Sequence, residues 1–394
     1  MSIKIVKGKR IAITANTSWY LFNFRANTIK KLISEGYNVV AIAPEDTYSQ
    51  KLKDLGCGYI SLKIDQGGIN PFKDAMTLFA ILGILIGNKF DAILNFTPKN
   101  NIYFSLVAKL FSIPVINNIA GLGNVFINGG VVRTVCRQLY RISQGSAAKI
   151  FFQNEEDRRM FLREIIPNYP RSVRLPGSGV DLQRFYRREA PDDGTVRFIL
   201  VARMLYSKGI KQYVDCARIL KQRYGDSCQF GLLGFLDVKN PTAVTAQDMA
   251  EWVEEGIIKY LGISDNVERE IAAADCVVLP SFYREGVPKS LLEAGAMGKP
   301  IITTDNVGCR ETVNHEINGF ICQPQNTESL LQVLDRMIRL SHQERCEMGK
   351  QSRLKMEKEF DESLVINSYI SALNEVFSHQ SEQAHQATDK PNLN

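Results

Sequence analysis

The sequence has few of the residues that build covalent or metal-bound scaffolds. Its eight cysteines are scattered singly and none forms a C-x-x-C pair. We therefore expect neither a disulfide framework nor a zinc site, and a reducing compartment fits best. All four histidines lie in the second half of the chain: His315, His342, His379 and His385.

Long hydrophobic runs are also missing. The N-terminal stretch MSIKIVKGKRIAITA has no extended apolar segment before its first expected strand, so we expect no signal peptide. The apolar segment 75–87 has 13 residues, too few to span a bilayer. It is either a helix buried in a core or a helix that lies in a membrane interface, flanked by Lys73 and Lys89.

The dinucleotide-binding fingerprint is absent as well. No G-x-G-x-x-G follows an early strand, and the segment GLGNVF (121–126) has two glycines at that spacing without the third. A nicotinamide-dependent oxidoreductase is therefore disfavoured.

Charge is distributed unevenly along the chain. Residues 1–180 carry 23 Lys and Arg against 11 Asp and Glu, a net charge of +12, and the remainder has a net charge of −6. A basic first half predicts an anionic partner, either nucleic acid or an anionic membrane surface, although an unevenly charged solvated surface gives the same pattern.

Short Val/Ile/Leu runs alternate with helix-like segments in two successive blocks. Continuous apolar runs indicate strands buried on both faces of parallel sheets. The expected strands are 10–15, 38–43, 91–96, 114–119, 149–153, 196–202, 229–233, 276–280 and 300–304. The pattern predicts an α/β protein with two doubly wound domains, in which ligands bind beyond the carboxyl ends of the strands.

The Gly-, Pro- and charge-rich stretch 174–194 marks the break between the domains. We predict an N-terminal domain over 1–180 and a C-terminal domain over 181–360. A final amphipathic helix follows over 361–378, and we expect the polar tail 379–394 to be disordered.

The segment FYREGVPKSLLEAG (282–295) places one carboxylate before an expected helix and another inside it. Pro288 suits the first helical turn, and the amides from Val287 to Leu291 form a phosphate site at the positive end of the helix dipole. Glu285 and Glu293 flank that site. A nucleotide-sugar has the matching layout of ribose, diphosphate and sugar.

Two cations are expected at the same sheet edge. In VARMLYSKG (201–209), Arg203 and Lys208 lie in the loop after the first strand of the second domain. There they can neutralise a leaving diphosphate.

These segments, with GCRETV (308–313) and NGFIC (318–322), resemble the donor-site motifs of glycosyltransferase family 4, retaining enzymes of the GT-B fold. The resemblance implies two Rossmann-like domains that face a central cleft, with the C-terminal helix crossing back. It places Arg203 and Lys208 on the donor diphosphate and Glu285 near the transferred sugar. It also implies a donor-binding set that caps the phosphates and holds the ribose: Gly286, Val287, Pro288, Lys289, Ser290 and Glu293. Segments 234–240 and 260–267 are expected to border the base.

The first domain resembles a narrower bacterial group, which extends saccharides linked to undecaprenyl diphosphate. The motifs are NTSWYLFNFR (16–25), TPKNNIYFSLVAKL (97–110) and NNIAGLGNVF (117–126). The residues expected to contact the acceptor are Asn16, Asn23, Arg25, Lys99 and Asn118. The aromatic residues of the first motif are equally consistent with a role in capping the first sheet.

Two departures from the family pattern matter. The histidine that many members carry in the first domain is missing, so its role falls to another residue such as Asn118 or to none. No D-x-D pair is placed at the cleft, and Asp192 and Asp193 lie in the linker as a turn, so neither a metal nor another cofactor is implied.

The expected function is thus retaining transfer of a hexose or N-acetylhexosamine from a UDP-sugar to a lipid-linked or other glycan acceptor. We expect a cytoplasmic enzyme, peripheral on an anionic membrane face, that binds no nucleic acid. The rival hypotheses are a nucleotide-sugar epimerase of the same architecture and a non-catalytic nucleotide-sugar-binding scaffold.

Overall fold

The computed structural model describes residues 8–65, 70–122, 131–167, 169–236, 240–284 and 286–388. The chain divides into two compact units. The N-terminal unit holds residues up to Leu175, apart from a short segment that begins at Gly121, and takes up the chain again from Ser363. The C-terminal unit holds that segment and the continuous stretch that begins at Pro176. The boundary thus falls five residues before the predicted one.

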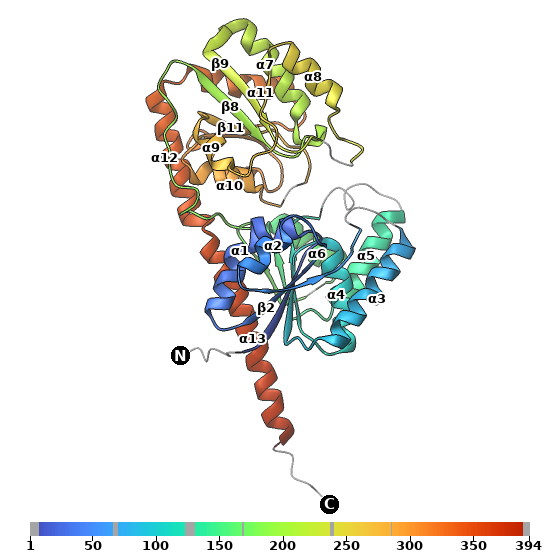
Figure 1. Cartoon of the computed structure of the whole chain (residues 1–394). Coiled ribbons are helices and arrows are strands. Elements are labelled where there is room, and N and C mark those ends of the chain that lie inside the picture. Colours follow the sequence, from blue (N-terminus) through green and yellow to red (C-terminus); the bar gives the residue numbers. More distant parts are fainter. Residues whose placement is uncertain are drawn as a thin grey trace, which may run out of the picture. The chain divides into compact units, whose positions relative to one another are not determined.

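The N-terminal unit is built on a parallel sheet of seven strands, ordered β3-β2-β1-β4-β5-β6-β7. Its strands are β1 (Arg10–Thr14), β2 (Asn38–Ala43), β3 (Gly58–Ser61), β4 (Ala92–Asn95), β5 (Val115–Ile119), β6 (Lys149–Phe152) and β7 (Ser172–Arg174). Its helices are α1 (Ser18–Ser34), α2 (Ser49–Asp54), α3 (Pro71–Gly87), α4 (Pro98–Leu110), α5 (Val131–Gln144) and α6 (Glu155–Glu164). The helices cover both faces of the sheet (Figure 1).

The C-terminal unit repeats this plan with six parallel strands, ordered β10-β9-β8-β11-β12-β13. Its strands are β8 (Val196–Val201), β9 (Cys228–Leu233), β10 (Lys259–Tyr260), β11 (Cys276–Leu279), β12 (Ile301–Thr304) and β13 (Gly319–Cys322). Its α-helices are α7 (Ile210–Tyr224), α8 (Ala246–Glu254), α9 (Val267–Ala272), α10 (Lys289–Ala296), α11 (Thr327–Arg339) and α12 (His342–Glu359). Short 3-10 turns join some of them, among them η2 (Tyr206–Lys208).

The last helix, α13 (Glu362–Thr388), returns the chain to the N-terminal unit. Its buried side chains, Tyr369 and Phe377 among them, pack in one core cluster with β1, β2 and β4. The predicted crossover is confirmed, but the prediction of disorder from residue 379 is wrong as far as Thr388. Its Glu, Gln and Ala residues favour continuation of a helix that is already anchored by packing.

The apolar segment predicted at 75–87 belongs to α3, which is 17 residues long. One face of α3, with Thr77, Ile81 and Leu85, is buried against the unit. The opposite face is exposed, so a helix buried on all sides is excluded.

Candidate functional site

The order of the C-terminal sheet reverses between β8 and β11. From β8 the chain passes outward to β9, and from β11 it passes in the other direction to β12. In open parallel sheets, ligands bind beyond the carboxyl ends of the strands at such a switch point. The loops that leave β8 and β11 meet there: Gly209 has a left-handed φ of 78°, and a Cβ on it would lie 2.2 Å from the carbonyl oxygen of Pro280.

Backbone hydrogen bonds join these two loops. The carbonyl oxygen of Ser207 accepts from the amides of Phe282 and Tyr283, both at 3.1 Å. The β11 loop is also held from β12, because Asn306 donates to the carbonyl of Tyr283 at 2.7 Å. The switch point is therefore a fixed backbone frame.

Lys208 is positioned by this frame. It ends η2 and its side chain is only 8% exposed. Its Nζ lies 5.5 Å from the centre of the Tyr283 ring, which is within the range of a cation–π contact. Arg203, the second predicted cation, lies in the same loop and is exposed. Both cations thus lie on the loop that leaves β8.

Helix α10 follows the loop that contains Tyr283, whose ring Lys208 contacts. Pro288 precedes its first residue, Lys289, with φ −63°, so the predicted helix start is correct to one residue. Val287 is buried against Gly177, where an added Cβ would come within 2.7 Å of it. The amides of the first turn of α10 have no earlier helical carbonyl to bind, which suits this end to an anion. Gly286 and Ser290 lie on either side of this start and are partly exposed.

Glu293 lies one turn inside α10. Burial raises the pKa of its carboxyl group to about 7, although the charges of Lys289 and Arg184 act in the opposite direction. Arg184 comes from the linker before β8 and grips Glu268 with two hydrogen bonds, of 3.2 and 3.0 Å. No motif in the sequence predicts this Arg184–Glu268 pair. The only signal was the charge of the linker.

The two segments expected to border a base lie next to the cation loop. The amide of Gly234 donates to the carbonyl of Gly262 at 2.8 Å, which joins segments 234–240 and 260–267. Gly234 has φ 145°, and an added Cβ would lie 1.8 Å from the carbonyl oxygen of Ala202. The structure thus brings these segments to within one residue of Arg203.

Glu285, predicted near the transferred sugar, lies outside the described residues. Within the part of the chain that the structure describes, no cluster of three or more His, Cys, Asp or Glu side chains could hold a metal ion.

The switch point of the N-terminal sheet lies between β1 and β4 and differs in chemistry. Neutral side chains form a buried chain of hydrogen bonds there. Thr14 donates to Asn95 at 2.7 Å, Asn95 donates to Asn117 at 2.7 Å, and Asn117 donates to Ser105 at 2.9 Å and to Gln144 at 2.6 Å. We call these five residues the amide network.

Asn118 follows the network on β5 and is 1% exposed. Among the described residues, neither its Oδ1 nor its Nδ2 has a hydrogen-bond partner. Because buried amides normally have partners, Asn118 is the predicted acceptor contact that most clearly has bonding capacity to spare.

The other predicted acceptor contacts are dispersed over the same unit. Asn16 follows β1 and is partly exposed, and Asn23 donates to the carbonyl of Trp19 at 3.0 Å. Lys99 forms an ion pair of 2.6 Å with Asp74. Arg25 is 1% exposed, with its guanidinium carbon 4.4 Å from the centre of the Phe96 ring. Arg25 is thus a core residue in this structure, and its contact with the acceptor stays a prediction.

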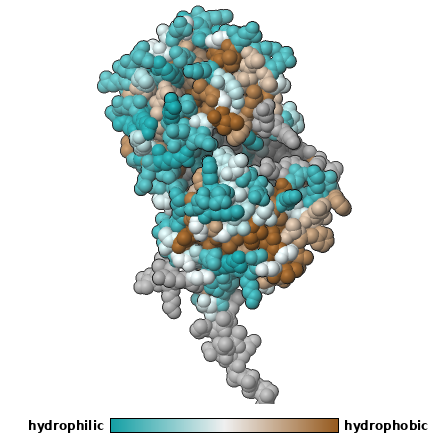
Figure 2. Space-filling view, in the orientation of Figure 1, coloured by the Kyte–Doolittle hydropathy of each residue, from teal (hydrophilic) through white to brown (hydrophobic). Residues whose placement is uncertain are grey.

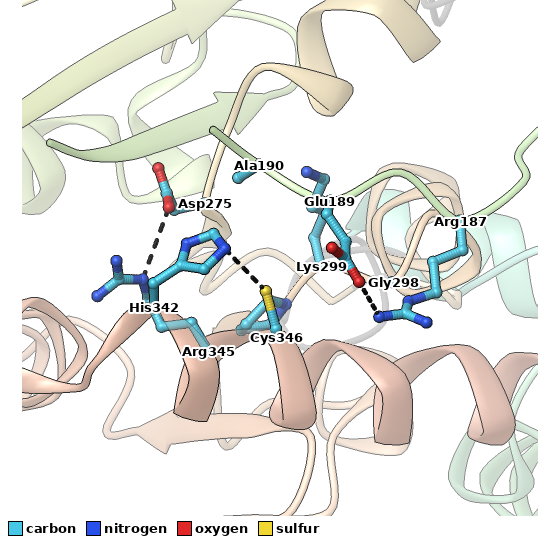
Figure 3. Close-up of a pocket in the computed structure, with 10 residues that line it drawn as sticks. Arg187, Glu189, Ala190, Asp275, Gly298, Lys299, His342, Arg345 and Cys346 are labelled. Carbon is cyan, nitrogen blue, oxygen red and sulfur yellow. Dashed lines mark hydrogen bonds and ion pairs between the residues drawn. The ribbon is translucent and has the colours of Figure 1, made fainter. Parts of the chain in front are cut away.

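A second polar cluster lies at the amino ends of the C-terminal strands, away from the switch point. Figure 3 shows Asp275, Arg345, His342 and Cys346 around a cavity of about 10 Å³. Arg345 Nε lies 3.6 Å from Asp275, and His342 Nε2 lies 3.3 Å from Cys346 Sγ. The cavity has room for about one water molecule, so we do not assign the reaction to it.

This arrangement of two parallel-sheet units, with two cations on a loop at the switch point of the second, is that of the GT-B fold. Residues 10–154 match the family model for glycosyl transferase 4-like domains, and residues 183–355 match the model for glycosyl transferases group 1. Both models describe glycosyltransferase domains, and the chain is a glycosyltransferase.

Characterised relatives agree with this assignment. The chain is 27% identical over 387 residues to the N,N'-diacetylbacillosaminyl-diphospho-undecaprenol alpha-1,3-N-acetylgalactosaminyltransferase of Campylobacter jejuni, covering 94% of this chain and 100% of that protein. It is 22% identical to the UDP-Gal:alpha-D-GlcNAc-diphosphoundecaprenol alpha-1,3-galactosyltransferase of Escherichia coli, covering 68% of this chain and 72% of that protein.

Solved structures share the fold. Sucrose-phosphate synthase from Thermosynechococcus elongatus superposes with a TM-score of 0.77 at 16% identity, covering 94% of this chain and 100% of that one. Anabaena Alr3699/HepE in complex with UDP gives a TM-score of 0.72 at 16% identity, covering 92% and 98% of the two chains.

Proposed function

We propose that this glycosyltransferase moves a hexose or N-acetylhexosamine from a UDP-sugar to a saccharide linked to undecaprenyl diphosphate, with retention of anomeric configuration. The observation that carries the proposal is Lys208, held where the two switch-point loops are hydrogen-bonded and in contact with Tyr283. The loop that contains Tyr283 leads into α10, and Glu293 lies one turn inside that helix. The relatives that act on undecaprenyl-linked sugars and the UDP complex of a structural neighbour support the choice of acceptor and nucleotide.

In this mechanism the donor diphosphate lies between the cations and α10. Arg203, Lys208 and the first amides of α10 stabilise the negative charge that develops as UDP leaves. Glu293 accepts hydrogen bonds from the ribose hydroxyls, which donate best to its ionised form, and Glu285 orients the transferred sugar. Segments 234–240 and 260–267 border the base.

The bond from the anomeric carbon to the diphosphate oxygen breaks, and a bond to the acceptor hydroxyl oxygen forms on the same face. The departing diphosphate oxygen takes the hydroxyl proton, so atoms and charge balance without an enzyme nucleophile. No metal ion takes part in this scheme. In the N-terminal unit, Asn16, Asn23 and Asn118 bind acceptor hydroxyl or acetamido groups, and Lys99 binds acceptor phosphate.

The acceptor also sets the location. An undecaprenyl chain stays in the bilayer, so we propose that the enzyme works as a peripheral protein on the anionic inner face of the cytoplasmic membrane. Within the described residues, no helix is both long and apolar enough to cross that membrane. The net charge of +12 over residues 1–180 favours an anionic surface.

The test is transfer of radiolabel from a panel of UDP-sugars and GDP-mannose to a synthetic undecaprenyl-diphosphate-linked saccharide. We expect one UDP-sugar to label the lipid product, with the donor's anomeric configuration seen by NMR. Release of an epimerised free sugar, or UDP binding without any turnover on the full panel, would contradict the proposal. The same assay is then run on Lys208→Ala. Its matched control is Lys211→Ala, which changes an exposed lysine three residues beyond Lys208.

A further inference from the structure

Helix α3 presents a row of large apolar side chains to solvent. Phe72 is 76% exposed, Met76 61%, Phe79 73% and Ile86 68%. The spacing of four, three and seven residues puts all four on one side of the helix. Figure 2 shows hydrophobic surface gathered where Figure 1 labels α3. We call these four residues the α3 face.

Neighbouring residues extend this surface. Leu110 is 74% exposed and Phe111 39%, at the end of α4, the helix that packs beside α3. Single exposed apolar residues are ordinary on soluble proteins, but an aligned group marks an interaction surface. The α3 face therefore needs an occupant.

The charges around the face identify that occupant. Lys73 lies in the first turn of α3, 3.9 Å from Asp65, and Lys89 follows the helix, while Lys109 lies beside Leu110. All three lysines are exposed. An apolar helical face bordered by lysines fits the headgroup region of an anionic leaflet. A second copy of the same face would bring like charges together.

The single acidic residue between Asn70 and Lys89 does not oppose this reading. Asp74 forms its 2.6 Å ion pair with Lys99 on α4, and both side chains are largely buried. The carboxylate is thus neutralised within the unit. At 17 residues α3 is too short to span a bilayer, so it would lie in the plane of the interface.

We propose that the α3 face seats the enzyme in an anionic leaflet. The biological reason for this membrane contact rests on the proposed function, because an enzyme that acts on a lipid-linked acceptor has to reach the membrane. The Asp74–Lys99 pair joins the first turns of α3 and α4 at the carboxyl edge of the sheet. A lipid lying against α3 therefore has its diphosphate headgroup close to Lys99, the proposed acceptor phosphate contact.

The test is flotation of the purified full chain with phosphatidylcholine vesicles, with and without phosphatidylglycerol, and with no donor or acceptor present. We expect binding that needs phosphatidylglycerol. Phe79→Glu and Met76→Glu should each weaken it roughly tenfold or more, because an inserted apolar side chain is replaced by a charge. Leu354→Glu is the matched control, since Leu354 is a 55% exposed helical residue of the C-terminal unit. Circular dichroism checks the fold of each variant.

Three results would overturn the inference. They are failure of the wild type to bind the vesicles, unchanged binding by both α3 variants, and sedimentation of the wild type as a dimer that Phe79→Glu dissociates. Transfer to a water-soluble acceptor with a short lipid should be unaffected in the α3 variants. Vesicle binding without any transfer by the wild type would refute the proposed function and leave this inference standing.

Discussion

The two sheets have the same strand order and opposite chemistry at their switch points. In the C-terminal unit the loop after β8 carries the cations Arg203 and Lys208, and the loop after β11 leads to the start of α10. In the N-terminal unit the corresponding edge is occupied by the neutral, buried amide network. The difference teaches that topology selects where a ligand binds, whereas the residues after the strands select what is bound: as we propose, an anion in one unit and a neutral saccharide in the other.

The strongest way to break this comparison is to remove the buried cation. Lys208→Ala should lower kcat for transfer by about 10²–10³, as loss of a transition-state charge stabiliser does. Lys211→Ala should leave kcat unchanged. The measurement is the initial rate at saturating UDP-sugar, with the thermal midpoint as a check on folding. A Lys208→Ala enzyme with wild-type kcat would mean that the diphosphate is bound elsewhere.

The amide network tests the opposite side of the comparison. Asn117→Ala should lower the free energy of unfolding by about 2–3 kcal/mol, because it leaves buried partners on Asn95, Ser105 and Gln144 without their hydrogen bonds. Denaturant unfolding measures the change in the free energy of unfolding. The control is Asn38→Ala, which changes an exposed asparagine on a strand of the same sheet. UDP affinity should not change, since the network lies in the other unit. If Asn117→Ala lost UDP affinity and kept its stability, the proposal that the donor nucleotide binds to the C-terminal unit would be contradicted.

Glu293→Gln should have a smaller effect on transfer. It keeps the side-chain shape but loses the charge that favours two donating hydroxyls, so kcat/KM should fall about tenfold, mainly through a higher KM for the donor. Glu254→Gln, at the exposed end of α8, is the control. If Glu293→Gln and the wild type have equal kcat/KM, then Glu293 does not bind the ribose.

The smallest expected effect is a pH dependence of stability. The pKa of Glu293 is raised to about 7 by burial, so between about pH 4.5 and 7 the folded state holds a proton that the unfolded state has lost. This group therefore stabilises the fold less as pH rises through that window. Glu293→Gln should therefore gain stability relative to the wild type as pH rises from 5 to 8. A difference that is constant with pH would show that the carboxyl group titrates normally.

Most strands could be predicted, and the ones that were missed share a physical cause. The predicted strand starts and ends agree with the structure to about one residue, because buried central strands have continuous Val/Ile/Leu runs. The missed strands are β3, β7, β10 and β13, the two edges of each sheet. These edge strands have only two to four residues without such a run, and β3, β7 and β10 are also partly exposed.

The site was predictable where a loop motif carried it. Arg203, Lys208 and α10 could be placed from VARMLYSKG and VPKSLLEAG, because each motif directly follows an identifiable strand. Arg184 could not, because its contact with Glu268 joins residues that are distant in the sequence. Two residues of the amide network, Asn95 and Asn117, stand out in the sequence as polar residues within the apolar strands DAILNF and PVINNI. Their hydrogen-bond partners depend on the fold and could not be predicted.

Helix α13 gives the chain an order of assembly. Apart from a short segment that begins at Gly121, the C-terminal unit is one continuous stretch, whereas the N-terminal unit lacks Tyr369 and Phe377 of its core until the final residues are made. On the ribosome, the half that emerges first is thus the half that closes last. Until then its sheet has an open apolar face, and a polypeptide that stops short of α13 never covers it.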